Sequence, residues 1–165
     1  MTRTAFGPVV GVNASANILY ALGPSGSLQI VNGAPDPEEV LTTVTLPFAC
    51  ALDPIGIDPV RNRIYIPNRT SNEIVILDGT TGQSRGTVLL DKKLGSIDGV
   101  HGVAFDAARN VLYAIAWSEG GRYSFLYAVQ DGHQRALQIP GGAGGPVLNP
   151  RFNKVYMWAG PAGVD

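Results

Sequence analysis

A tyrosine set among apolar residues recurs four times along this chain of 165 residues, at a spacing that few architectures allow. The four copies are Ile18-Leu19-Tyr20-Ala21, Arg63-Ile64-Tyr65-Ile66, Val111-Leu112-Tyr113-Ala114 and Lys154-Val155-Tyr156-Met157. Successive tyrosines are 45, 48 and 43 residues apart. A nearly fixed period of this length indicates structural repeats, each of which packs on its neighbours along the chain.

A turn signal precedes every tyrosine. An asparagine stands three positions before each one, and an Asn or Asp stands four positions earlier still, at Asn13, Asp58, Asp106 and Asn149. The earlier side chain can accept a backbone N–H, and the later asparagine (Asn17, Asn62, Asn110 or Asn153) tolerates a left-handed backbone. The pattern predicts a hairpin turn between two antiparallel strands.

A second turn is predicted after the next apolar segment of each complete unit, at Asn32-Gly33, Asp78-Gly79 and Asp131-Gly132. These dipeptides readily take positive φ. Each unit therefore consists of four short strands, which in unit two are expected at residues 55–57, 63–67, 73–77 and 86–90. The second strands are apolar on both faces, so each sheet must lie between two others. The 21 glycines and 12 prolines also disfavour long helices.

These features predict an all-β chain, a β-propeller of about 3.5 four-stranded blades in a single domain. The blades are expected at about residues 8–52, 53–99 and 100–143, followed by a half-blade at 144–165. Half a blade leaves a strand edge unpaired, which natural proteins avoid. We expect the open ends to be covered by a second copy, giving about seven blades, or by another polypeptide. The remaining alternative is a fragment of a longer propeller.

Unit two contains the stretch Ile57-Asp58-Pro59-Val60-Arg61-Asn62-Arg63-Ile64-Tyr65-Ile66-Pro67-Asn68, which continues as Ser71-Asn72-Glu73-Ile74-Val75-Ile76-Leu77-Asp78-Gly79-Thr80-Thr81-Gly82. This stretch resembles a YVTN-type repeat of the NHL/YncE-like β-propellers. The resemblance covers about residues 9–158, although unit one lacks the proline and the charged residue of the turn and unit three has a longer loop. It implies a propeller with roles that range from binding proteins to lactonases, and it favours a periplasmic or secreted location.

Charge and composition limit the classes of partner that the sequence favours. Twelve basic and 13 acidic residues give a net charge of −1, so the chain has no field that favours nucleic acid. No apolar run approaches the ~20 residues that span a bilayer. The single cysteine, Cys50, is expected to be a small buried apolar group rather than a nucleophile. The sequence has no GxSxG, HExxH, P-loop or paired-cysteine motif, and no cofactor is predicted.

Ligands of propellers usually bind at the axial mouth, where the first strands of the blades begin. Asp53 and His101 occupy the same position in their repeats, five residues before Asp58 and Asp106 respectively. Asp98 is close to His101 in the sequence. These three could hold a metal or form an acid–base pair. The alternative is that His101 lines a wet channel and Asp98 belongs to a turn.

A longer loop is predicted in unit three, from Trp117 to Tyr123, and it includes Arg122. Trp, Arg and Tyr dominate binding hot spots, although such aromatic residues can also cap a blade edge. Asn68 and Arg69 occupy the matching loop of unit two and are expected on the same face. Trp158 is expected to be either a core residue that has lost its covering blade or an anchor for the polypeptide that completes the ring.

Two functions follow from these residues. The first is a non-catalytic scaffold or binding subunit that mediates protein–protein interaction within a larger assembly. The alternative is a metal-dependent enzyme of the lactonase or lyase type with its site at the axial mouth. The absence of a catalytic motif and the open half-blade favour the scaffold.

Overall fold

The chain folds into successive antiparallel sheets. The computed structural model describes residues 7–34, 39–48, 53–94 and 97–160, in which three four-stranded sheets precede a two-stranded one. Blade one contains β1 (Val9–Asn13), β2 (Ile18–Leu22), β3 (Leu28–Asn32) and β4 (Glu39–Val44). Blade two contains β5 (Gly56–Asp58), β6 (Arg63–Pro67), β7 (Glu73–Asp78) and β8 (Ser84–Leu89). Blade three contains β9 (Ile97–Asp106), β10 (Val111–Ser118), β11 (Tyr123–Gln130) and β12 (His133–Pro140), and the half-blade contains β13 (Val147–Asn149) and β14 (Lys154–Tyr156).

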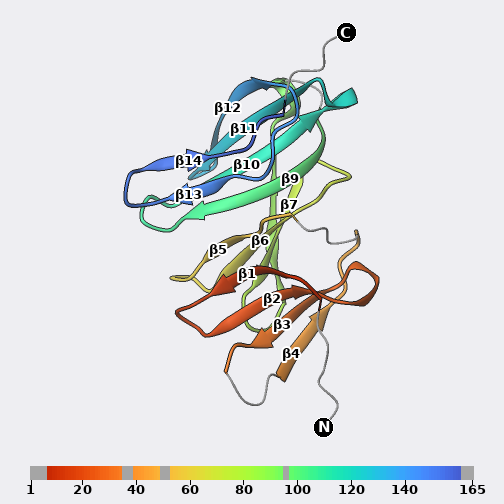
Figure 1. Ribbon diagram of the computed structural model, residues 1–165, viewed down its shortest axis with the longest axis vertical. Coiled ribbons are helices and arrows are strands. Elements are labelled where there is room, and N and C mark those ends of the chain that lie inside the picture. The colour runs from red at the N-terminus through yellow and green to blue at the C-terminus, as the bar shows by residue number, and fades with distance from the viewer. Residues whose placement is uncertain (1–6, 35–38, 49–52, 95–96, 161–165) are drawn as a thin grey trace.

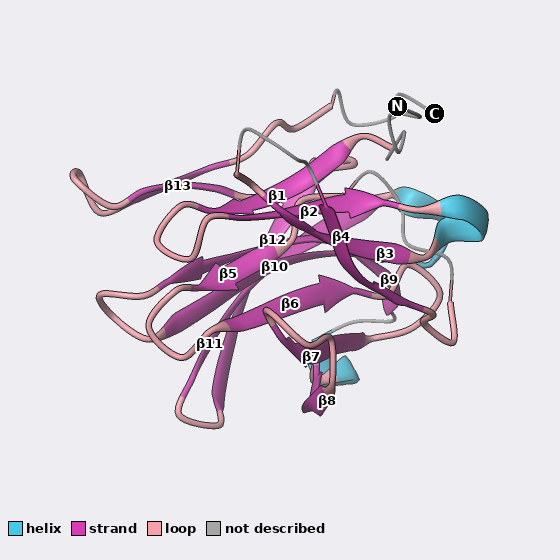
Figure 2. Cartoon of the chain, turned by 90° about the horizontal axis from the view of Figure 1, so that it is seen from below, coloured by secondary structure: helices cyan, strands magenta, loops and turns pink. Residues whose placement is uncertain are grey.

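The strands of each sheet follow one another in chain order. Blades one, two and three are stacked along the long axis of the molecule, and β13 lies beside β9 (Figure 1). Three short 3₁₀ turns, at Pro24–Gly26, Lys92–Leu94 and Glu119–Gly121, lie at strand ends in the described ranges (Figure 2). These ranges contain no helix of the length and apolarity that crossing a membrane requires. The predicted all-β architecture of blades is confirmed, while Cys50 lies outside the described residues.

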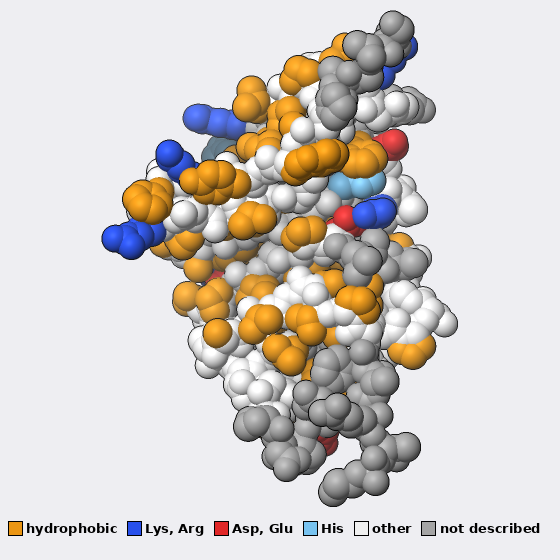
Figure 3. Space-filling view, viewed as in Figure 1, with side chains coloured by type: hydrophobic (Ala, Val, Ile, Leu, Met, Phe, Trp, Pro, Cys, Tyr) orange, Lys and Arg blue, Asp and Glu red, His pale blue; other side chains and the backbone are white. Residues whose placement is uncertain are grey.

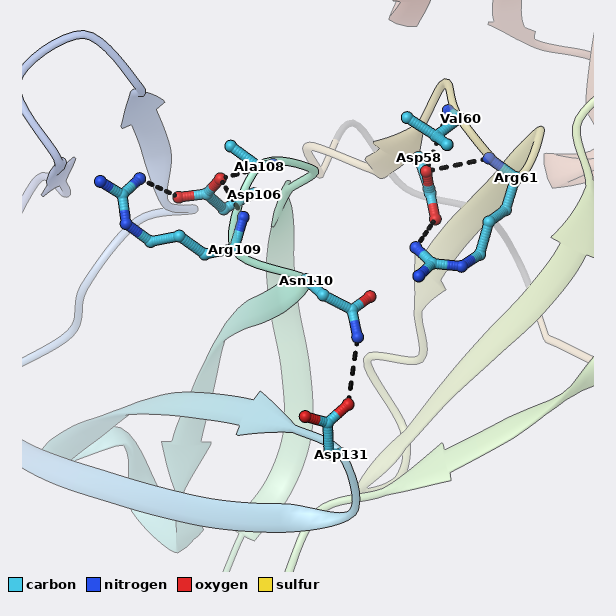
Figure 4. A network of polar contacts seen from close by, with 8 residues as sticks. All are labelled: Asp58, Val60, Arg61, Asp106, Ala108, Arg109, Asn110 and Asp131. Carbon is cyan, nitrogen blue, oxygen red and sulfur yellow. Dashed lines mark hydrogen bonds and ion pairs between the residues drawn. The ribbon is translucent and has the colours of Figure 1, made fainter.

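The first hairpin turn of each unit has the predicted chemistry. Asn17, Asn62, Asn110 and Asn153 all take positive φ, between 51° and 56°. The Asp58 carboxylate accepts the backbone N–H groups of Val60 and Arg61 at 3.0 and 3.1 Å and pairs with the Arg61 guanidinium. Asp106 makes the same set of contacts in blade three (Figure 4). One buried acid therefore holds each of these turns closed.

The second turn follows the prediction in only one unit. In blade three, Asp131 and Gly132 both take positive φ. In blade two, Asp78 instead accepts the N–H groups of Thr80 and Thr81, and the positive φ falls on Gly82. The prediction of positive φ at Asn32-Gly33 and Asp78-Gly79 is wrong, because a side-chain cap at these positions builds a different turn.

Gly33 and Gly79 are needed for close approach rather than for positive φ. The Gly79 N–H donates to the Asn62 carbonyl at 2.8 Å, and the Gly33 N–H donates to the Asn17 carbonyl at 2.7 Å. A Cβ on Gly79 would lie 2.6 Å from Asn62 Oδ1 and 2.7 Å from the Tyr20 hydroxyl. The second turn therefore packs directly on the first turn of the same blade and, in blade two, on the preceding blade.

The hydrophobic core lies between the sheets. One cluster joins blades one and two and includes Tyr20, Ile30, Ile64 and Leu77. A second cluster joins blades two and three and includes Tyr65, Ile74, Val103, Leu112 and Tyr127. Because blade two contributes to both clusters, its two faces are buried by different neighbours, as the apolar pattern of the sequence predicts.

Candidate functional site

The axial mouth is the end of the blades where the inner strands β5 and β9 begin. β9 contains two irregularities in its pairing with β10: Ala116 and Ile115 face Val100 and Gly102, and Ser118 and Trp117 face Ile97 and Gly99. His101 and Asp98 are therefore left without partners in β10. Bulges of this kind redirect side chains and often occur at functional sites. The predicted turn at Asp98 is thus a bulge within a strand.

An ion pair that the sequence did not predict links Asp53 to Arg69. The Arg69 Nη2 donates to Asp53 Oδ1 at 2.6 Å, and Nε donates to the second carboxylate oxygen. The Asp53 side chain is 9% exposed, whereas that of Arg69 is 48% exposed. Two parallel hydrogen bonds fix the plane of the guanidinium, so Arg69 presents a rigid positive charge at the mouth.

His101 stacks on Trp117. The ring centroids lie 4.0 Å apart and the planes differ by 9°. Burial, and to a smaller extent the charge of Arg69, lower the pKa of His101 below its ordinary value of 6.5. Asp53 and Asp98 act on this pKa in the opposite direction without reversing it. His101 is therefore a neutral ring near pH 7.

Residues 141–144 connect this stack to the half-blade. The Trp117 indole N–H donates to the Ala143 carbonyl at 2.8 Å. The Gly144 N–H donates to the Trp158 carbonyl at 2.6 Å, and Ala143 forms a bridge with Ala159. Ser124 fixes the segment from the other side, because its hydroxyl contacts Gly141 and Ala143. The Gly-rich segment is thus an ordered connection between blades.

The predicted long loop of unit three does not form. Trp117 belongs to β10 and pairs with Ser124, while Tyr123 belongs to β11 and pairs with Pro140. Only residues 119–122 connect the two strands, and Gly120 and Gly121 take the positive φ that this tight connection needs. The extra residues of unit three lengthen its strands instead.

Most of the predicted residues fall into two groups. Asp53, Arg69, His101 and Trp117 meet at the mouth, with Asp98 exposed on the bulge beside them. On the face viewed in Figure 3, a histidine lies beside a basic and an acidic side chain, below a group of apolar ones. Asn68 has a structural role, because its buried amide caps Thr70 and its carbonyl accepts the Val100 N–H. The backbone carbonyls of Arg122 and Trp158 accept the N–H groups of Gly141 and Gly144. Tyr123 pairs with Pro140, and the side chains of Tyr123 and Trp158 are exposed.

The carboxylates and the histidine do not form a metal centre. Within the described residues, no group of three His, Cys, Asp or Glu side chains could hold a metal ion. Both Asp53 oxygens accept hydrogen bonds from Arg69, and one face of the His101 ring is covered by Trp117. The geometry provides a charged and aromatic surface rather than a set of ligands.

Comparison with known proteins defines the fold class. The chain matches a structure of a Nidogen/Laminin complex with a TM-score of 0.63 and 16% identity over 85% of this chain and 51% of that one. It matches BamB from Moraxella catarrhalis with a TM-score of 0.59 and 13% identity over 93% of this chain and 40% of that one. It matches the RRP9 WD40 repeats with a TM-score of 0.58 and 12% identity over 97% of this chain and 53% of that one.

The fold is that of a β-propeller, and the described blades make up part of one. The chain spans between 40% and 53% of the length of these three matched chains. No family model and no curated protein sequence matches it. At these identities the likeness establishes the fold alone.

Proposed function

We propose that this chain is a non-catalytic propeller scaffold whose axial mouth binds a protein partner within a larger assembly. The observation that carries the proposal is the half-exposed guanidinium of Arg69, held by Asp53 beside the stacked rings of His101 and Trp117. Arg and Trp are enriched in hot spots of protein interfaces. Because these side chains are already fixed, binding orders few of them, and its entropic cost is small.

The metal-dependent lactonase or lyase alternative requires Asp53, Asp98 and His101 to converge on one ion. In the part of the chain that the structure describes, both carboxylate oxygens of Asp53 instead accept hydrogen bonds from Arg69, and no three potential metal ligands come together. We therefore favour binding over catalysis. We also propose that the chain belongs to the YVTN/NHL-type propellers, on the strength of residues 57–82, with a periplasmic or secreted location as the corresponding expectation.

Site-specific photocrosslinking in the native host tests the binding proposal. A benzophenone side chain is introduced at Tyr123, which is exposed near the mouth, and separately at Val60, which is 78% exposed in the turn at the opposite end of the blades. We expect a discrete adduct with one other protein from position 123 and none from position 60. The second variant controls for collisions with any exposed apolar position.

The role of the ion pair is tested in the same assay. Replacing Arg69 with Ala in the Tyr123 crosslinking variant should abolish the adduct, and Arg69→Lys should weaken it, because a lysine cannot reproduce the two parallel hydrogen bonds to Asp53. Equal adducts from both positions, or an adduct that survives Arg69→Ala, would argue against the mouth as the binding surface.

A further inference from the structure

Three of the four repeated tyrosines, Tyr20, Tyr65 and Tyr156, show which blade faces are covered by a full blade. Tyr20 of blade one is fully buried against blade two, and its hydroxyl donates to the Gly79 carbonyl at 3.0 Å. Tyr65 of blade two is buried against blade three, where its ring stacks on Phe105 with centroids 5.0 Å apart. In each case the tyrosine faces the blade that follows in the chain.

Tyr156 occupies the same position in the half-blade and is 50% exposed. The exposed side chains of Val147, paired with Tyr156, and of Trp158 extend the same apolar face. Val155, which precedes Tyr156, and its partner Leu148 are partly buried. This is expected because neighbouring residues of a strand point to opposite faces, and the other face of the half-blade lies toward blade three. We call Val147, Tyr156 and Trp158 the C-terminal end face.

Blade one has an open face at the other end of the stack. Val12 occupies the repeat position of Ile57 and Phe105, just before the turn Asn or Asp. Phe105 covers the tyrosine of the preceding blade, whereas Val12 is 53% exposed, and Val9 on the same strand is also exposed. We call Val9 and Val12 the N-terminal end face. The two end faces are thus the two halves of a blade-to-blade contact.

We propose that the C-terminal end face receives the N-terminal end face of a second copy of this chain, so that two copies form one closed ring. In this contact Tyr156 packs on Val12 of the second copy, as Tyr65 packs on Phe105. The Tyr156 hydroxyl reaches the carbonyl of Gly33, which corresponds to Gly79 in the repeat. Two such contacts related by a two-fold axis close a ring of six four-stranded blades and two half-blades.

The charges of the two ends favour a second copy as the occupant. The described residues of blade one include Glu39 and no Lys or Arg, while those of the half-blade include Arg151 and Lys154 and no Asp or Glu. Opposite charges favour the end-to-end encounter over contact between two like ends.

Sedimentation velocity of the full chain tests the proposal. The unmodified chain should sediment as a particle of twice its mass of 17.3 kDa. Val12→Lys and Tyr156→Glu should each raise the dissociation constant of the dimer by at least about 30-fold. Val60→Glu, at a more exposed position away from both end faces, should have no effect. Circular dichroism confirms that each variant is folded.

Mixing the two single variants gives the sharpest result. A mixed pair contains one unmodified contact and one Lys–Glu contact, so it should form a dimer at concentrations at which neither variant does so alone. A chain that stays at 17.3 kDa at all concentrations, an open-ended series of larger species, or a mixture that fails to pair would overturn the proposal. Arg69→Ala should leave the dimer intact, which separates this test from that of partner binding at the mouth.

Discussion

The carboxylate of Asp58 is fully buried and holds its turn through two backbone N–H groups and one guanidinium. Asp58→Ala should lower the free energy of unfolding by about 1–3 kcal/mol, because two backbone N–H groups and the Arg61 guanidinium lose their acceptor. Asp58→Asn should cost less, since Asn13 caps the same turn of blade one with its amide oxygen. Urea titration of the two variants measures the difference. Equal losses would contradict a role for the cap.

His101 should make stability depend on pH. Its pKa is lowered in the folded chain below the ordinary value of 6.5, so the unfolded chain binds more protons between these two values. Stability should therefore fall as the pH drops below 6.5, until the folded form is protonated as well. In His101→Gln this part of the pH dependence should be absent. Thermal unfolding of both proteins between pH 5 and pH 8 checks it, and superimposable profiles would contradict the assignment.

At the residue scale, the sequence predicted the turns better than the site. Asp58 and Asn62 lie within one hairpin, so their roles follow from local chemistry alone. The Asp53–Arg69 pair is separated by 16 residues and a complete hairpin, so its formation depends on the curvature and register of blade two. The stack of His101 on Trp117 depends on two bulges in β9, and although Gly99 and Gly102 beside them are local signals of a bulge, they do not indicate which rings will meet.

At the scale of elements, Gly79 controls how closely blades one and two approach. Gly79→Ala should destabilise the chain by about 1–3 kcal/mol, because its Cβ would meet Asn62 Oδ1 and the Tyr20 hydroxyl within 2.7 Å. Gly142→Ala is the matched control, since the nearest side-chain atom there is 3.8 Å away. Denaturant unfolding of the pair measures the effect. Similar midpoints for the two variants would show that the blades do not meet at Gly79.

The sequence located most strands of blade two, and its error in unit three has a physical reason. β6 spans Arg63–Pro67 as predicted, and β7 extends one residue beyond its predicted end. In unit three the apolar run continues through Trp117, and adjacent glycines at 120 and 121 allow a tight connection, so β10 and β11 extend where a loop was expected. A count of residues between repeats cannot distinguish a longer loop from longer strands.

At the scale of the whole molecule, the repeat determined the fold because every unit needs a neighbour. Blades one and two bury their tyrosines against the next blade, while the half-blade leaves the outer part of blade three uncovered. A groove of about 410 Å³ lies there, lined by Tyr113, Ala128 and Arg135 among others. The second copy proposed at the end faces would be recognised through surfaces that extend beyond one repeat, and the local sequence pattern does not encode them.

The stacking of the blades is tested most directly by the exposure of individual tyrosines. The six tyrosines are replaced by 3-fluorotyrosine, and each ¹⁹F resonance is assigned with a Tyr→Phe variant. Broadening by a soluble paramagnetic agent is then measured at low and high protein concentration. Tyr20 and Tyr65 should be protected at both concentrations, and Tyr156 should be protected only at the higher one. If Tyr20 or Tyr65 broadens as readily as Tyr156 at both concentrations, the blades are not stacked as described.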